Sequence, residues 1–365
     1  MRYVDEFRDP SRIRTAAADL ARATTQPWTI MEICGGQTHA IARFALLELL
    51  PEGLSLVHGP GCPVCVTPSS VLNAARAIAL LPRVILASFG DMLRVPGTEG
   101  DLLDARAHGA DVRVVVSPID AVRLAASSRD REVVLFGVGF ETTAPAIAMA
   151  VLLAERMGLD NFSVLASHVR VPPAVAHLLS RPGNRVQAFL AAGHVCTVAG
   201  TEDYPPLAAR FGVPIVVTGF EPLDILRGLA LAVRQLEAGR AEVENQYDRS
   251  VQREGNVRAR EAVARVFAVA DTRWRGIGMI AEGGLRMREA YASFDAERRF
   301  GVSATADEAP TRCRAGEVLQ GRLRPPECPE FGRGCTPDRP LGAPMVSSEG
   351  ACAAHHRYLR RAVSA

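Results

Sequence analysis

The chain has 365 residues, with 42 basic and 40 acidic residues interleaved and a formal net charge of +2. This length exceeds one hydrophobic core, so two or three domains are expected, and the even charge excludes the basic stripe of a nucleic-acid-binding protein. The longest apolar run, 144–154, is too short to cross a bilayer, and the mixed N-terminus is no secretory signal. A cytoplasmic protein without a membrane partner is expected, with its eight cysteines reduced, redox-active or metal-bound.

Residues 1–27 are predicted to form one amphipathic helix and a linker. From Trp28 onward, short apolar runs alternate with longer helical runs, which predicts parallel sheets covered by helices on both faces. The expected strands are 28–31, 55–57, 84–88, 112–116, 133–138, 163–167, 188–191 and 214–218. The expected helices are 39–50, 68–81, 118–127, 144–157, 172–180 and 222–238. The fold class is therefore α/β.

A weak internal repeat divides this region. Residues 33–38 resemble 138–143, residues 58–66 resemble 192–198, and residues 88–91 resemble 218–221, in the same order. The repeat predicts two similar α/β domains, 28–135 and 136–240, whose glycine loops face one cleft. The alternative is that any two α/β halves share glycine turns.

Residues 241–365 form a third predicted unit. Up to about Phe300 the chain is rich in Arg and Glu and reads as mostly helical, with helices expected at 257–267 and 284–291. Beyond Phe300 it is rich in Pro, Gly and Cys, with little periodicity. Such an irregular stretch cannot build a large apolar core. A helical and irregular domain is therefore expected, stabilised by interactions other than an apolar core.

The motif Cys34-Gly35-Gly36-Gln37-Thr38-His39 follows the first apolar strand and precedes a helical run. Its glycines let a ligand approach the backbone, and the free N–H groups of the helix point at that ligand. The positive end of the helix dipole is expected to favour a thiolate at the cysteine. The alternative is a tight turn with a buried cysteine.

A C-x-x-C motif occurs at Cys62 and Cys65, after a Gly-Pro-Gly sequence. In a cytosolic α/β protein this motif indicates a redox dithiol or half of a metal site. No second C-x-x-C completes a four-thiolate zinc site, which favours the dithiol. A structural turn is the remaining alternative.

Four more cysteines lie in the irregular tail, with the spacing C-x14-C-x6-C-x16-C: Cys313, Cys328, Cys335 and Cys352. The spacing matches neither a ferredoxin nor a zinc finger. Four thiols in a tail without a core are nevertheless typical of a module stapled by metal. A 4Fe-4S cluster and a structural zinc both fit, with His355 and His356 as further zinc ligands, and free or disulfide-bonded thiols are the alternative.

Residues 139–143 (Gly-Phe-Glu-Thr-Thr) open a predicted helix. Glu141 is expected either to line the cleft and contact an anion or nucleotide, or to cap the helix. No Walker loop or dinucleotide fingerprint is present, and ATP binding is left undecided. His168 and His194 each follow an apolar strand, as site or core residues, and Cys196 is expected to be a small buried residue.

Together these motifs resemble those of the hydrogenase maturation factor HypD family, in order and over nearly the whole chain. The resemblance runs through residues 34–39, 59–65, 139–143, 193–195, 328–332, 335–337 and 345–352. Two departures are visible: Pro344 stands where many members have another cysteine, and Cys196 stands where a serine is usual.

The resemblance implies a scaffold on which an iron atom receives cyanide and carbon monoxide, forming Fe(CN)2CO for the large subunit of a NiFe hydrogenase. The implied partners are a HypC-like small chaperone and HypE, which supplies cyanide made with HypF. The implied fold has two similar α/β domains and a tail that carries one 4Fe-4S cluster. Such a protein is mainly an assembly scaffold, and whether it is also an enzyme is left open.

By the same resemblance, Cys34 is the iron ligand, shared with a cysteine of the chaperone, and Cys62 and Cys65 are the redox dithiol. The cluster ligands are Cys313, Cys328, Cys335 and Cys352. Residues expected around the iron are Gly35, Gly36, Gln37, Thr38, His39, Glu141 and His194. Two rival functions remain: a cluster-linked thiol–disulfide oxidoreductase acting on a protein, and a structural zinc protein with an α/β ligand-binding module.

Overall fold

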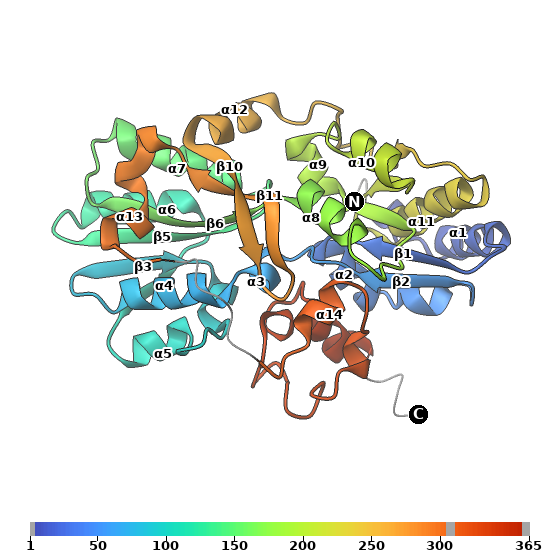
Figure 1. Cartoon of the computed structure of the whole chain (residues 1–365), viewed down its shortest axis with the longest axis horizontal. Helices are drawn as coiled ribbons and strands as arrows, with labels where there is room; N and C mark the ends of the chain where they lie inside the picture. Colours follow the sequence, from blue (N-terminus) through green and yellow to red (C-terminus); the bar gives the residue numbers. More distant parts are fainter. Residues whose placement is uncertain (1–3, 304–310, 360–365) are drawn as a thin grey trace.

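The computed structural model describes residues 4–303 and 311–359. Two α/β lobes lie side by side, and an irregular C-terminal module, residues 311–359, packs below their junction (Figure 1). The expected α/β fold with two sheets is confirmed.

The first sheet is parallel throughout and has five strands in the order β2-β1-β7-β8-β9. On one face lie α1 (Pro10–Ala23), α2 (Gly35–Arg43) and α11 (Pro222–Glu237). On the other lie α8 (Val171–Leu179), α9 (Gly193–Ala199) and α10 (Tyr204–Phe211). Because both faces are covered, the strands are almost wholly apolar. Their bounds are β1 Trp28–Glu32, β2 Leu54–His58, β7 Ala188–Ala192, β8 Ile215–Thr218 and β9 Val243–Asn245.

The second sheet is mixed and has six strands in the order β10-β11-β6-β5-β3-β4. The last four are parallel, and the hairpin β10–β11 joins antiparallel at the β6 edge. The strands are β3 Val84–Ser88, β4 Asp111–Val114, β5 Glu132–Gly139, β6 Phe162–Val169, β10 Phe267–Trp274 and β11 Gly278–Met287. The helices of this lobe are α4 Ser69–Ala79, α5 Leu102–Ala107, α6 Pro118–Ser127, α7 Ala144–Arg156, α12 Val257–Val266 and α13 Ala296–Phe300.

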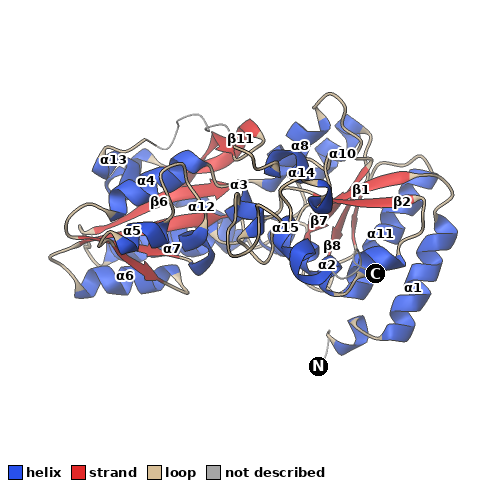
Figure 2. Cartoon of the chain, turned by 90° about the horizontal axis from the view of Figure 1, so that it is seen from below, coloured by secondary structure: helices blue, strands red, loops and turns tan. Residues whose placement is uncertain are grey.

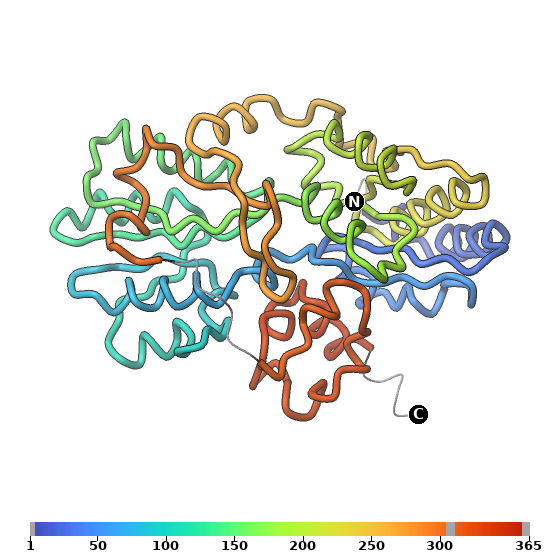
Figure 3. The backbone as a smooth tube through the Cα atoms, in the orientation of Figure 1, coloured from blue at the N-terminus to red at the C-terminus, as the bar shows by residue number. Residues whose placement is uncertain are grey.

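The expected boundary at residues 135/136 does not separate the two sheets. The chain builds β1 and β2 in the first lobe and β3 to β6 in the second, then returns to the first lobe for β7 to β9. Figure 3 shows this path, because the right-hand lobe combines blue with yellow-green chain. Each half of the repeat region therefore contributes to both sheets.

The two sheets share one strand order, β2-β1-β7-β8-β9 in the first and β4-β3-β5-β6-β11-β10 in the second. In the first sheet the strand order reverses between the neighbours β1 and β7. In the second sheet it reverses between β3 and β5. Residues 34–38 and 139–143 each follow a strand beside a switch point, β1 and β5, but in the shared strand order β1 corresponds to β3 and β5 to β7. Residues 58–66 follow β2 whereas residues 192–198 follow β7, and these strands are not equivalent.

Three local expectations need correction. The helix expected at 39–50 is α2, which starts at Gly35 and ends at Arg43, and Ala45 then adopts a positive φ of 52°. The helix expected at 284–291 is wrong, because β11 runs to Met287 and pairs with β6. Its hairpin partner β10 was not expected as a strand.

The C-terminal module contains only short helices, as its composition predicts. These are α14 (Ala315–Leu319) and α15 (Ala351–Ala354), and α15 lies against α2 (Figure 2). Short helical turns complete the fold: α3 Pro63–Val66, the 3-10 turns Asp5–Phe7, Leu46–Leu49, Gly90–Arg94, Glu289–Phe294, Pro325–Glu327 and Ala343–Met345, and a π turn His355–Leu359. Within the described residues no helix has the length and apolar character needed to span a membrane.

Candidate functional site: thiols at the junction of the lobes

Cys34 lies where the strand order of the first sheet reverses. It follows β1 and precedes α2, and His194 follows the neighbouring strand β7. The Sγ atom of Cys34 is 3.7 Å from Nδ1 of His194. Ligands of open α/β sheets bind outside the carboxyl ends of the strands at such a switch point. The fold thus brings together two of the predicted site residues, which are far apart in sequence.

Glycines allow the backbone around Cys34 to pack closely. A Cβ on Gly61 would lie 2.1 Å from the Cys34 nitrogen, and the Gly35 N–H donates to the Gly61 carbonyl at 2.8 Å. A Cβ on Gly35 would lie 2.6 Å from Cβ of Glu349. The loop before the C-x-x-C motif and the C-terminal module therefore both lie against the Cys34 turn.

Burial determines the ionisation of Cys34. Desolvation raises the pKa of the thiol well above its usual value, and hydrogen bonds from the backbone N–H groups of Gln37 and Gly36 only partly oppose this rise. The expectation that the helix N-terminus favours a thiolate is therefore wrong for the protein alone. The residue is 1% exposed, so within the described residues the expected cleft does not open at this sulfur.

A buried carboxylate, Glu32, holds the Cys34 turn. Its Oε2 accepts the Cys34 N–H at 2.9 Å, while its Oε1 accepts from Thr38 and lies 2.6 Å from Nδ1 of His58. His58 Nε2 lies 2.8 Å from Nε2 of His355, so one of these imidazoles donates to the other. Burial lowers the pKa of His355 to about 3. This network joins the turn to the C-terminal module, and sequence reasoning missed it except for Thr38.

Two predicted residues, Gln37 and His39, have partners away from the sulfur. The Gln37 amide donates to the carbonyls of Ala191 at 3.3 Å and Thr218 at 3.1 Å, which fixes the ends of β7 and β8. His39 Nδ1 donates to the Ser348 carbonyl at 3.0 Å. These side chains tie together the elements around Cys34.

Glu141 also forms its hydrogen bond with a partner other than Cys34. Its Oε1 accepts the backbone N–H of Val171 at 2.9 Å, at the start of α8. Burial raises the pKa of its carboxyl to about 7. Cys196 is buried as expected, and burial raises its pKa to about 12. His168 packs against Phe267 in the second lobe, 5.3 Å between ring centroids, as a core residue.

His194 faces Cys34 as a neutral ring. Burial lowers its pKa to about 4, and its ring stacks on Phe220 at 5.1 Å between centroids. Phe220 also limits the space beside Gly36, where a Cβ would meet its ring at 3.2 Å. An uncharged imidazole packed in this way can accept the Cys34 S–H through Nδ1.

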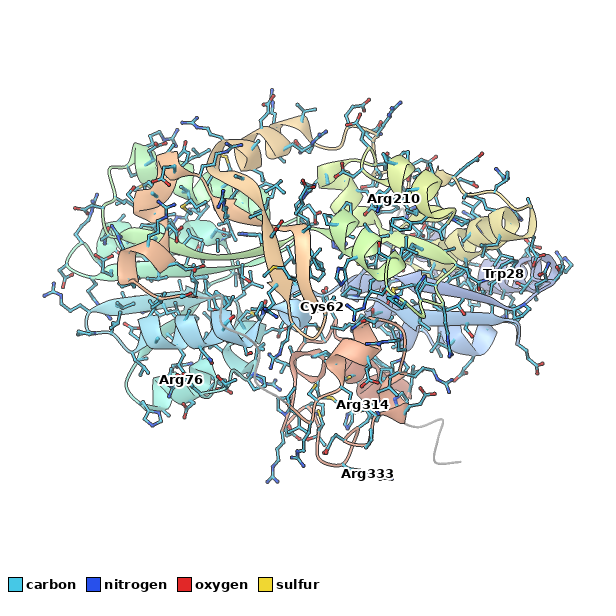
Figure 4. All side chains as sticks on the ribbon, in the orientation of Figure 1. Trp28, Cys62, Arg76, Arg210, Arg314 and Arg333 are labelled. Atoms are coloured by element: carbon cyan, nitrogen blue, oxygen red, sulfur yellow. The ribbon has the colours of Figure 1, made fainter. Side chains whose placement is uncertain are left out.

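Cys62 and Cys65 lie on the short helix α3, with sulfurs 2.6 Å apart. Figure 4 labels Cys62 near the centre of the molecule, between the lobes. Both residues are buried in one apolar cluster, here called the central cluster, which also contains Cys34 and Trp274. Burial raises the Cys65 pKa well above its usual value, and the hydrogen bond to Cys62 adds to this rise.

The four cysteines of the module influence one another's ionisation. Burial raises the pKa of Cys352 well above its usual value, and the other three thiols, Cys313, Cys335 and Cys328, raise it further. The Leu341 N–H donates to Cys335 Sγ at 3.4 Å, and a Cβ on Gly342 would lie 2.2 Å from Cys313 Sγ. Backbone donors and a glycine that leaves room for sulfur suit thiolates that carry an iron–sulfur cluster.

In residues 4–303 and 311–359, no three His, Cys, Asp or Glu side chains gather closely enough to hold a single metal ion. A 4Fe-4S cluster requires a wider spacing of its thiolates than a single ion does, because each thiolate binds a different iron atom.

These features define the class: a two-lobed α/β protein whose thiols, from three separate stretches, meet where the lobes and the module join. The chain belongs to the HypD family, whose model, described as "Hydrogenase formation hypA family", matches residues 11–359. It is 47% identical to the hydrogenase maturation factor HypD of Azotobacter vinelandii, over 99% of this chain and 98% of that protein. The HypD proteins of Rhodobacter capsulatus and Escherichia coli K12 are each 46% identical, over 98% of both chains.

Proposed function

We propose that this chain acts in hydrogenase maturation, as the scaffold on which an iron atom is held while it acquires cyanide and carbon monoxide as Fe(CN)2CO. One observation carries the proposal: Cys34 Sγ lies at the switch point of the first sheet, 3.7 Å from His194 and in one apolar cluster with the dithiol. Family membership supports the same function.

The iron is the cargo of this site, and Cys34 is its ligand. Ferrous iron with cyanide and carbon monoxide is soft and prefers a thiolate. Because burial keeps the Cys34 thiol protonated, iron binding must release that proton, and the positive charge of the metal replaces it. The N–H groups of Gly36 and Gln37 then lie close to the sulfur, where they can also donate to a cyanide nitrogen.

The Cys62–Cys65 pair is the redox element of the proposal. Opening a disulfide between them consumes two electrons and two protons and gives two thiols beside Cys34. A 4Fe-4S cluster on Cys313, Cys328, Cys335 and Cys352 would supply electrons one at a time when bound. The turn Ala343–Met345 supports this route, because it packs against both α3, which carries the dithiol, and α15, which carries Cys352.

The partners follow from the family. A HypC-like chaperone would share the iron through its own cysteine, HypE with HypF would provide cyanide, and the hydrogenase large subunit would receive the product. Since Glu349 lies against Gly35, partner binding must move part of the C-terminal module before iron reaches Cys34.

The test is infrared spectroscopy of the protein, purified without oxygen together with its small chaperone. Cyanide and carbon monoxide bands should appear in the wild type, disappear in Cys34→Ala and persist in Cys196→Ala, which removes another buried thiol. Brown cluster absorption should remain in both variants. Persistent bands in Cys34→Ala would refute the iron site, and their absence from the wild type would favour the oxidoreductase alternative.

A further inference from the structure

A small cavity lies where the first lobe contacts the C-terminal module. One wall is the loop that follows α8, residues 181–186, and the other wall is the segment that follows α14, residues 320–322. Figure 1 shows the chain after α8 descending towards α14. The cavity has a volume of about 160 Å³. None of the residues predicted to hold iron or a cluster lines it.

Three arginine side chains line this cavity, and the described part of the chain contributes no acidic side chain to it. Arg181 and Arg185 belong to the loop, and Arg322 belongs to the module. Arg181 donates from Nη1 to Nε2 of His177 at 3.3 Å. In residues 4–303 and 311–359, the guanidinium groups of Arg185 and Arg322 form no salt bridge. Because arginine stays protonated in proteins, the cavity carries a permanent positive charge.

The carboxylates nearest to Arg322 in sequence already have other partners. Glu317 accepts a hydrogen bond from Arg314 at 2.7 Å, and Glu327 accepts one from Arg324 at 2.7 Å. The loop itself contains no acidic residue. The three guanidinium groups therefore repel one another, and an anion bound between them would relieve this repulsion.

Packing and hydrogen bonds hold both walls in place. On the module side, Gly321 lies against the first sheet, where an added Cβ would be 2.9 Å from Cε of Met31 in β1. On the loop side, the Asn184 amide donates to the Val186 carbonyl at 3.2 Å and accepts the Val186 N–H at 3.1 Å. A ligand therefore meets a preformed cavity and pays little entropy to order it.

We propose that this cavity binds a small oxyanion, namely a phosphate group. The planar fork of a guanidinium matches the oxygens of a phosphate, and a phosphate monoester carries nearly two negative charges at neutral pH. Sites for drug-sized ligands have volumes of about 300 Å³ or more, so this smaller cavity holds a single phosphate group. The ligand is either free inorganic phosphate or a phosphorylated small molecule whose remainder lies outside. Since the arginines come from both walls, the bound anion also connects the first lobe to the module.

The experiment is isothermal titration calorimetry of the full-length protein at low ionic strength, with inorganic phosphate and methyl phosphate as probes. Saturable binding to the wild type is expected, with acetate binding more weakly than either probe. Arg185→Gln and Arg322→Gln remove one guanidinium from each wall. Each should weaken phosphate binding about tenfold, because a charge-assisted hydrogen bond is lost. Arg106→Gln changes an exposed arginine of α5 in the second lobe, so it is the control for net charge and should bind like the wild type.

The two probes distinguish the sources of the phosphate group. Tighter binding of methyl phosphate would identify a phosphorylated molecule as the ligand, and tighter binding of inorganic phosphate would identify the free ion. A wild type without saturable binding of either probe would overturn the proposal, and so would equal affinities in the wild type and both cavity variants. An equal loss of affinity in Arg106→Gln would also overturn it, because net charge alone would then explain the binding. These measurements involve neither iron nor a cluster, so their result is separate from that of the proposed function.

Discussion

At the residue scale, Cys34 shows that burial can shift the pKa of a thiol more than the N-terminus of a helix does. The motif correctly indicates a cysteine at the start of a helix with glycines beside it. A sequence does not show that β7, α9 and the C-terminal module cover this turn, and so it does not show that desolvation dominates the thiol pKa. The same limit applies to Glu32, a charged residue at the end of an apolar strand. Its buried partner His58 contacts His355, which is 323 positions after Glu32 in the chain.

Glu141 gives a residue-scale prediction about pH. Burial raises its pKa from 4.5 to about 7. Between these values the unfolded chain has lost the proton while the folded chain keeps it, so the free energy of unfolding should fall as pH rises and level off above about 7. The contribution is at most about 1.4 kcal/mol per pH unit.

Denaturant unfolding across this pH range checks the prediction. Glu141→Gln keeps an acceptor for the Val171 N–H and should show a smaller fall than the wild type. Glu52→Gln, which changes an exposed carboxyl, should behave like the wild type. An equal fall in all three proteins would show that Glu141 ionises normally.

At the element scale, periodicity finds the strands of both parallel regions except β9, which has only three residues. It misses β10 and β11 for a physical reason. Exposed charged residues such as Arg286 and Glu282 alternate with small ones there, and paired glycines at 283 and 284 interrupt the apolar pattern. Only tertiary pairing with β6 makes this segment a strand.

The contact between α14 and the tip of the hairpin β10–β11, residues 274–277, gives an element-scale prediction. Gly316→Ala should improve the local helix propensity of α14, yet its Cβ would meet the Gly276 oxygen at 2.0 Å. We expect a net loss of about 1–3 kcal/mol, as in other overpacked sites. Hydrogen exchange should become faster at the hairpin tip while β5 stays protected.

The matched control is Gly90→Ala, since the nearest atom to a Cβ there is 3.9 Å away on Val114. Its unfolding free energy and exchange should match those of the wild type. If Gly316→Ala is as stable as this control, the tip and α14 do not pack as described.

At the scale of the whole molecule, the sequence predicts two similar α/β units but not how they share strands. Nothing local marks the points after β2 and β6 where the chain crosses from one lobe to the other. The motifs after β1 and β5 are visible in the sequence, whereas the interleaving follows only from the sheet order.

Interleaving predicts that residues 28–135 do not fold alone. This fragment holds β1 and β2 of the first sheet and β3, β4 and the first half of β5 of the second. It lacks β7, the neighbour of β1, and β6, the neighbour of β5. Its circular dichroism should show no cooperative thermal transition. Co-expression with residues 136–365 is the control, and a cooperative transition of the isolated fragment would mean that its strands pair differently.

The central claim is that Cys34 holds one iron atom separate from the cluster iron. Mössbauer spectroscopy of the ⁵⁷Fe-enriched protein, purified without oxygen with its chaperone, tests it most directly. We predict a low-spin ferrous component beside the cluster signal, lost in Cys34→Ala while the cluster signal remains. A low-spin component that survives Cys34→Ala, with the chaperone still bound, would contradict the claim.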